Sequence, residues 1–300
     1  MRPITVLSAP SNLGLKPPEP RRVPGVRKAP RALISNGLLF GLQALDGGRI
    51  KPPPYRPKID PATGIRNAYA IRQYSLALGE SVEATLRAGH FPLVIGGDCS
   101  ILIGTALALR RLGRFGLIFL DGHTDYQTPE TSASGGAAGM DLAIVTGCGA
   151  DLLTDIDGLK PYIRDSNVVI FGNRDIDDRD TYPAQEVFES DVSMITLDYA
   201  REIGVDLAAA LAVELLRQRG VDGFWIHLDA DVIDSAIMPA VDSPMPGGMT
   251  YDELIVVLRT LLQSGMTVGM QTTVYDPDLD PDGSAARAFV DALVESFAVT

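Results

Sequence analysis

Six side chains that could bind divalent metal ions follow three short apolar runs of the sequence: Cys99, Asp121, His123, Asp125, Asp229 and Asp231. The run GLIFL leads into DGHTD, the run GFWIHL leads into DADVID, and the turn GGDCS closes a third run. Side chains two apart on an extended segment point the same way. Each set of ligating side chains is therefore expected to converge on one point at the end of its strand.

Carboxylates and imidazole suit Mn²⁺, Zn²⁺ or similar ions, and several shared carboxylates suit two adjacent ions. Without metal such a cluster is costly, because neighbouring carboxylates cannot all ionise comfortably. A single Asp-x-Asp after a strand is more often a turn or a helix cap. The coincidence of Asp-x-His-x-Asp with Asp-x-Asp, each after a buried type of strand, favours a metal centre that activates water.

Short apolar runs alternate with helical patterns along the chain, which is typical of βαβ units and a mostly parallel sheet. We expect strands at residues 4–7, 91–95, 116–120, 167–171, 223–228 and 267–274, and helices at 30–42, 67–88, 100–111, 206–218, 250–263 and 284–297. In open parallel sheets, ligand sites form beyond the carboxyl ends of the strands, where the metal-binding side chains stand. Residues 46–66, rich in Gly and Pro, predict a surface loop within one domain that covers residues 1–300.

The composition is that of an ordinary globular protein, with 300 residues of which 46% are hydrophobic and 21% charged. The net charge of −12 argues against nucleic acid or an anionic membrane as a partner, because both need clustered Lys and Arg. Two cysteines are too few for a disulfide scaffold, and the N-terminal residues lack the apolar core of a signal peptide. The sequence predicts a soluble, cytoplasmic protein.

The segments GGDCS, DGHTD and HLDADVID resemble, in order and spacing, the three metal-binding motifs of the arginase/agmatinase/formimidoylglutamase (ureohydrolase) family. The resemblance extends over nearly the whole chain, and HTDYQTPETSASG is similar to the arginase substrate loop. It implies a three-layer α/β/α sandwich with a central, mostly parallel sheet, and two Mn²⁺ ions bridged by hydroxide. It also implies a small, cationic guanidino-type substrate and a homo-oligomer, either a trimer or a hexamer.

Residue by residue, the resemblance implies that Asp121 and Asp229 bridge the two ions, with Cys99 and Asp125 completing one site and His123 and Asp231 the other. Asp231 would also carry the proton of the attacking water. Three further positions would contact the substrate: Gln127, Ser134 and Asp177. His227 lies two residues before Asp229, on the same face of its strand but deeper. It is interpreted as a core residue or a support for the ligands rather than as a ligand.

The chain departs from the family pattern at several of these positions. Cys99 stands where the family has His, and a thiolate shifts metal preference toward Zn²⁺, Fe²⁺ or Ni²⁺. Alternatively, Cys99 is simply a small buried residue and one metal binds weakly. Ala138 replaces a loop His, Val274 replaces the Glu that binds guanidinium, and Gln127 and Gly136 stand where Asn is usual.

These departures leave the substrate open and argue against assuming L-arginine. Glu130 or Asp141 could supply a compensating negative charge, although either could equally be a solvated loop residue. The leading hypothesis is a metal-dependent hydrolase that cleaves a C–N bond of a guanidino, amidino or similar compound and releases urea or an analogue. A non-catalytic metal-binding or regulatory member of the same fold is the alternative, and hydrolysis of an amide is a third.

Overall fold

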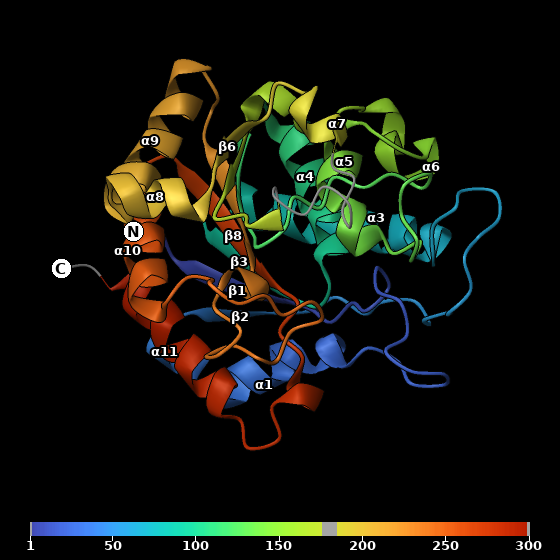
Figure 1. Cartoon of the computed structure of the whole chain (residues 1–300), viewed down its shortest axis with the longest axis horizontal. Helices are drawn as coiled ribbons and strands as arrows, with labels where there is room; N and C mark the ends of the chain where they lie inside the picture. The colour runs from blue at the N-terminus through green and yellow to red at the C-terminus, as the bar shows by residue number, and fades with distance from the viewer. Residues whose placement is uncertain (1, 176–184, 299–300) are drawn as a thin grey trace.

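The computed structural model describes residues 2–175 and 185–298, and in them the middle layer is one parallel sheet (Figure 1). Its eight strands lie in the order β2-β1-β3-β8-β7-β4-β5-β6. The strands are β1 (Ile4–Ala9), β2 (Leu45–Arg49), β3 (Phe91–Gly96), β4 (Gly116–Leu120), β5 (Val168–Phe171), β6 (Ser193–Ile195), β7 (Phe224–Asp229) and β8 (Thr267–Thr273). Every strand pair between them is parallel, which confirms the predicted sheet.

Helices cover both faces of this sheet and give the predicted three-layer α/β/α sandwich (Figure 1). One face carries α1 (Ala29–Ser35), α2 (Leu38–Gly41), α8 (Leu197–Ile203), α9 (Val205–Gln218), α10 (Tyr251–Gln263) and α11 (Ser284–Phe297). The other carries α3 (Ala68–Arg87), α4 (Leu102–Leu112), α5 (Asp141–Thr146) and α6 (Asp151–Thr154). A further short helix, α7 (Gln185–Phe188), follows the undescribed segment. None of the helices described is long and apolar enough to cross a membrane.

The central strands are apolar on both sides because both of their faces are covered. Along β4, Ile118 and Leu120 enter the core beneath α9 and α10, whereas Leu117 and Phe119 enter the core beneath α3 and α4. A continuous apolar run such as GLIFL therefore supplies two cores at once. Since β3, β8, β7 and β4 are neighbours, the three strands followed by metal-binding motifs end at the same edge of the sheet.

Two expected elements differ from those observed. The loop expected at residues 46–66 begins with the edge strand β2, whose exposed sequence LDGGR has little intrinsic strand preference and pairs with β1. The helix expected at residues 30–42 is divided into α1 and α2. Gly37, with a φ of 93°, adopts a left-handed conformation that interrupts it.

Candidate metal centre

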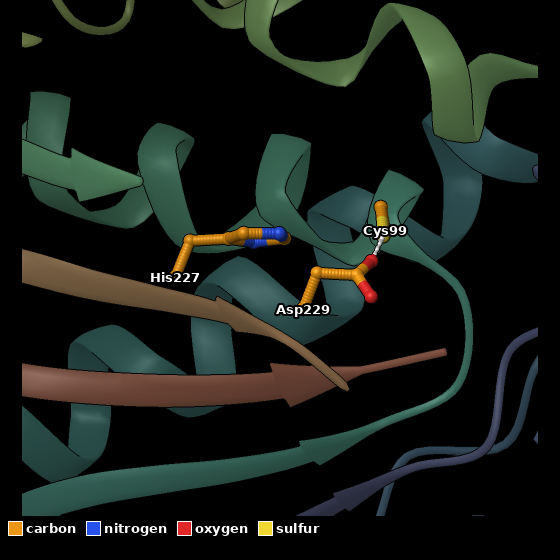
Figure 2. Close-up of side chains that lie close together, drawn as sticks. All are labelled: Cys99, His227 and Asp229. Carbon is orange, nitrogen blue, oxygen red and sulfur yellow. Dashed lines mark hydrogen bonds between the residues drawn. The ribbon is translucent and has the colours of Figure 1, made fainter. Parts of the chain in front are cut away.

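Two groups of buried ligating side chains gather beyond the carboxyl ends of β3, β4 and β7. The first consists of Cys99, His227 and Asp229 (Figure 2), and the second of Asp121, His123 and Asp231. Within each group the ligating atoms lie within 4.8 Å of one another. Five of the six predicted ligands are therefore brought into these groups. The sixth, Asp125, is outside both but is half-buried in the wall of the same cavity.

Cys99 is held by the turn that follows β3. The carboxylate of Asp98 accepts hydrogen bonds from Ser11 Oγ (2.6 Å) and from the backbone N–H groups of Gly14 and Ser100 (3.0 Å each). This fixes the start of the short 3₁₀-helix that carries Cys99. The thiol of Cys99 donates to Asp229 Oδ2 at 2.7 Å, so the ends of β3 and β7 meet directly.

Asp121 belongs to the second group and also faces the first. Its Oδ1 accepts from the backbone N–H of His123 (2.7 Å) and lies 3.6 Å from His123 Nδ1. Its Oδ2 lies 3.9 Å from Nε2 of His227, on the side of the other group, and has no hydrogen-bond partner among the described residues. His123 Nδ1 is also 3.0 Å from Asp231 Oδ2. The two oxygens of Asp121 thus face two different sets of donors.

Burial and mutual repulsion dominate the electrostatics of this cluster. Burial raises the pKa of Asp121 and of Asp229 well above the ordinary value, and the charge of Asp231 raises both further. Burial raises the pKa of Asp125 to about 8, although His123 opposes the shift. Asp231 differs, because burial raises its pKa but His123, together with hydrogen bonds from Gly122 and Asp121, holds that pKa below the ordinary value.

The chemistry of this donor set fits divalent cations. Burial also raises the pKa of the Cys99 thiol well above its ordinary value, and Asp229 adds to this shift. Without a cation, the buried carboxyl groups and the thiol avoid mutual repulsion only by staying protonated. A cation replaces those protons with a favourable charge, and Asp121 Oδ2, which accepts no hydrogen bond from a described residue, has a lone pair to offer it. The residues present therefore fit the two-ion centre that the motifs predict.

The metal-free protein should lose stability as the pH rises from about 4 to about 8. Asp121, Asp125 and Asp229 have raised pKa values in the folded state, so their contribution is complete below the unfolded pKa and is lost as each deprotonates in the fold. Because a tenfold change in an acid dissociation constant is worth about 1.4 kcal/mol, Asp125 alone, with its pKa raised to about 8, should account for a loss of several kcal/mol. Thermal melts of chelator-treated protein across this range measure it.

Adding metal should flatten this profile, because bound cations stabilise the ionised carboxylates. Asp125→Asn should reduce the slope in the metal-free protein, since one titrating group with a pKa of about 8 is removed. A metal-free protein that becomes more stable toward pH 8 would contradict this reading of the cluster.

The centre opens on a cavity of about 270 Å³ whose wall contains most of the positions singled out from the sequence. The predicted ligands on this wall are Cys99, His123, Asp125, Asp229 and Asp231, and the predicted substrate contacts are Gln127 and Ser134. Gly136, Ala138 and Val274, where family side chains are missing, also line it. Asp177 lies outside the described residues.

Glu130 and Asp141 were expected as sources of a negative charge in place of the Glu missing at position 274. Neither residue lies on the cavity wall. Glu130 is exposed, and Asp141 is buried with neither carboxylate oxygen hydrogen-bonded to a described residue. Asp242 and Lys16 line the cavity instead. They come from loops distant in the sequence, and no local pattern around either one signals the site.

The segment GNRDID contributes two supporting residues that the sequence interpretation did not name. Asp175 accepts from Thr124 N (2.8 Å) and Thr124 Oγ1 (2.9 Å), which fixes the turn after β4. Arg174 donates to the backbone carbonyl oxygens of Asp231 (2.9 Å) and Val232 (3.0 Å). Both lie within three residues of Asp177, an expected substrate contact, and this proximity was the signal that could have identified them.

An all-parallel α/β sandwich with carboxylates, two imidazoles and a thiol gathered at one sheet edge is an arrangement suited to a metal-dependent hydrolase. The chain belongs to the arginase family, whose model matches residues 3–298. It is 31% identical over 299 residues to the arginase of Bacillus caldovelox, covering 97% of this chain and 96% of that protein. It is 30% identical over 302 residues to the arginase of Staphylococcus aureus strain COL, covering 98% of this chain and 96% of that protein.

The structures agree with this relationship. The native structure of the Bacillus caldovelox arginase superposes with a TM-score of 0.89 and 29% identity, covering 100% of this chain and 99% of that one. The family and fold predicted from the motifs are thereby confirmed. So is the enzyme class, that of ureohydrolases acting on C–N bonds of amidino groups, at the level of the family.

Proposed function

We propose that this chain is a two-metal hydrolase that cleaves a C–N bond of a small guanidino, amidino or related compound. The observation that supports it is that Asp121, a member of one group of ligating side chains, also faces the other group, and that side chains of both groups line one cavity. We further propose that residues 1–300 act as one domain in a cytoplasmic homo-oligomer, a trimer or hexamer, without nucleic acid or membrane partners. Light scattering of the purified protein tests the subunit count.

The proposed ligands divide into two sets that share Asp121 and Asp229. Cys99 and Asp125 complete one set, and His123 and Asp231 the other. Bound there, two divalent cations would lower the pKa of water and polarise the trigonal carbon of the substrate. We propose Mn²⁺ as the ion, with Zn²⁺, Fe²⁺ or Ni²⁺ as alternatives that the thiol of Cys99 favours.

The remaining steps fall to side chains on the cavity wall. The Oδ2 atom of Asp231, 3.0 Å from His123 Nδ1, is proposed to accept the proton that the attacking water gives up. Gln127 and Ser134 are proposed to orient the substrate, together with Asp177. The carboxylate of Asp242 supplies a negative charge for a cationic substrate at a wall where Val274 supplies none.

Urea or ammonia release from a panel of guanidino and amidino compounds tests the function, with metal-loaded protein and Asp231→Asn as the inactive control. We expect turnover of at least one compound by the unsubstituted protein alone. Full metal occupancy without turnover of any compound would instead support the non-catalytic, metal-binding alternative.

Replacing Cys99 by histidine is expected to shift the metal preference toward Mn²⁺ by about tenfold or more relative to Zn²⁺, because imidazole is a harder donor than thiolate. Competition between the two metals, followed by elemental analysis, measures the ratio. Cys148→Ser is the matched control, since Cys148 is the other free cysteine and lies outside both ligand groups. An unchanged ratio in Cys99→His would show that Cys99 does not bind metal.

A further inference from the structure

A set of fully buried polar side chains lies beneath the metal centre, on α4, β7 and β8. Gln271 is at its middle. The Oε1 atom of Gln271 is 2.7 Å from Thr105 Oγ1 and 3.2 Å from Trp225 Nε1, and its Nε2 atom is 2.8 Å from His227 Nδ1. The strand register places His227 directly beside Gln271, so this contact is built into the sheet.

Trp225 decides which way the amide of Gln271 points. An indole N–H can only donate a hydrogen bond, so the amide atom that faces Trp225 must be the oxygen. The amide nitrogen of Gln271, with its two hydrogens, then faces His227. Nδ1 of His227 must accept that hydrogen bond, which requires it to carry no hydrogen. The imidazole therefore carries its hydrogen on Nε2.

The ring of His227 is also fixed in direction. It stacks on Phe119 of β4, with ring centroids 4.4 Å apart and planes 4° from parallel. From β7 it extends toward Cys99 and Asp229 (Figure 2). Its Nε2 lies 3.9 Å from Oδ2 of Asp121, and neither atom has a hydrogen-bond partner among the residues described. A donor and an acceptor without other partners thus lie next to each other inside the centre.

We propose that His227 is a positioning residue that directs its Nε2–H at the carboxylate of Asp121, and that it is not a metal ligand. A ring nitrogen that carries a hydrogen has no lone pair to give to a metal. His227 therefore stays out of the coordination sphere, although its ligating atom lies within 4.8 Å of those of Cys99 and Asp229. The ion beside Cys99 is left with one sulfur and several oxygen donors. This inference rests on the proposed metal centre.

The position of the hydrogen can be read directly by nitrogen NMR of protein labelled with ¹⁵N-histidine. The chain has only 3 histidines, and His227→Gln assigns the signals. We expect Nε2 to carry the hydrogen and Nδ1 to carry none, in the metal-free and in the zinc-loaded protein. Loss of the Nε2 hydrogen on zinc binding would overturn the inference. The tautomer of His227 in the metal-free protein can be measured even if the protein binds no metal. A failure of the proposed function can therefore be distinguished from a failure of this inference.

Gln271→Glu should move the hydrogen of the His227 ring from Nε2 to Nδ1, with little change in the shape of the side chain at position 271. The carboxylate still accepts from Trp225 and Thr105, but its second oxygen must accept from Nδ1 of His227, which frees Nε2 to bind metal. Zinc affinity should tighten by about 10- to 100-fold, and Nε2 should lose its hydrogen when zinc binds. Thr105→Val is the control, because it removes one hydrogen bond without reversing the amide, and should leave the tautomer unchanged.

An unchanged zinc affinity in Gln271→Glu, with the hydrogen still on Nε2, would contradict the proposed control of the ring by Gln271. If that variant does not fold, as judged by its circular dichroism, the NMR measurement on the unsubstituted protein decides alone.

Discussion

Replacing Asp121 by asparagine is expected to abolish hydrolysis and to lower the metal content from two ions per chain to at most one. One carboxylate oxygen lies 3.6 Å from Nδ1 of the proposed ligand His123, and the other lies 3.9 Å from His227 Nε2, on the side of the proposed ligands Cys99 and Asp229. An amide offers one acceptor oxygen and no charge, so it cannot bridge two cations. Turnover should fall on the order of a thousandfold, and elemental analysis reports the ion count.

The matched control is Asp141→Asn. Asp141 is as completely buried as Asp121, and burial raises its pKa in the same direction, but it lies outside both ligand groups and the cavity wall. It should keep both ions. Both variants remove a buried carboxyl group. An equal change in the melting temperature of the two metal-free variants would therefore reflect the loss of a buried acid rather than the loss of a metal ligand. Full metal content and activity in Asp121→Asn would be incompatible with a shared carboxylate.

Replacing Val274 by glutamate is expected to raise kcat/KM for guanidino compounds by about ten- to a hundredfold, the worth of one charge-assisted hydrogen bond. Val274 lies just after β8, is 4% exposed and lines the cavity. Its φ of 69° is in the left-handed region, which is unfavourable for a β-branched residue. Glutamate is not branched at Cβ, so the substitution reduces the backbone strain, although it does not remove it, while adding the missing charge.

Val274→Gln separates charge from shape, because glutamine has the length of glutamate and relieves the same strain. It should fold equally well and show no gain in kcat/KM. An equal gain in both variants would mean that strain or shape, rather than charge, limits turnover. If neither variant changes kcat/KM while both keep their metal, the substrate cation does not lie beside residue 274, and Asp242 becomes the next position to change.

The convergence of the acidic motifs could be predicted because it depends only on local geometry and on sheet class. Asp229 and Asp231 are two apart at the end of an apolar strand, and so are Asp121 and His123. Once the sheet is parallel, those strand ends must share an edge. That reasoning places the motifs at one edge of the sheet, and so a candidate metal centre could be predicted from the sequence, although only the strand order brings the three strand ends close together.

Features that depend on which residues pair across neighbouring strands could not be predicted from the sequence in the same way. The strand β2 forms only through its pairing with β1, since LDGGR has little strand preference of its own. The tautomer of His227 depends on Gln271, which is beside it only because of the register between β7 and β8. Lys16 and Asp242 reach the cavity from separate loops, whose paths are set by long-range packing.

The most direct test of the two-metal centre is anomalous diffraction from crystals grown with Mn²⁺ or Zn²⁺. We predict two peaks per chain, with the carboxylate of Asp121 between them. One peak should contact Cys99 and the other His123, and His227 should contact neither. Crystals without peaks at this sheet edge, or with Asp121 and Asp229 turned away from each other, would contradict the two-metal centre.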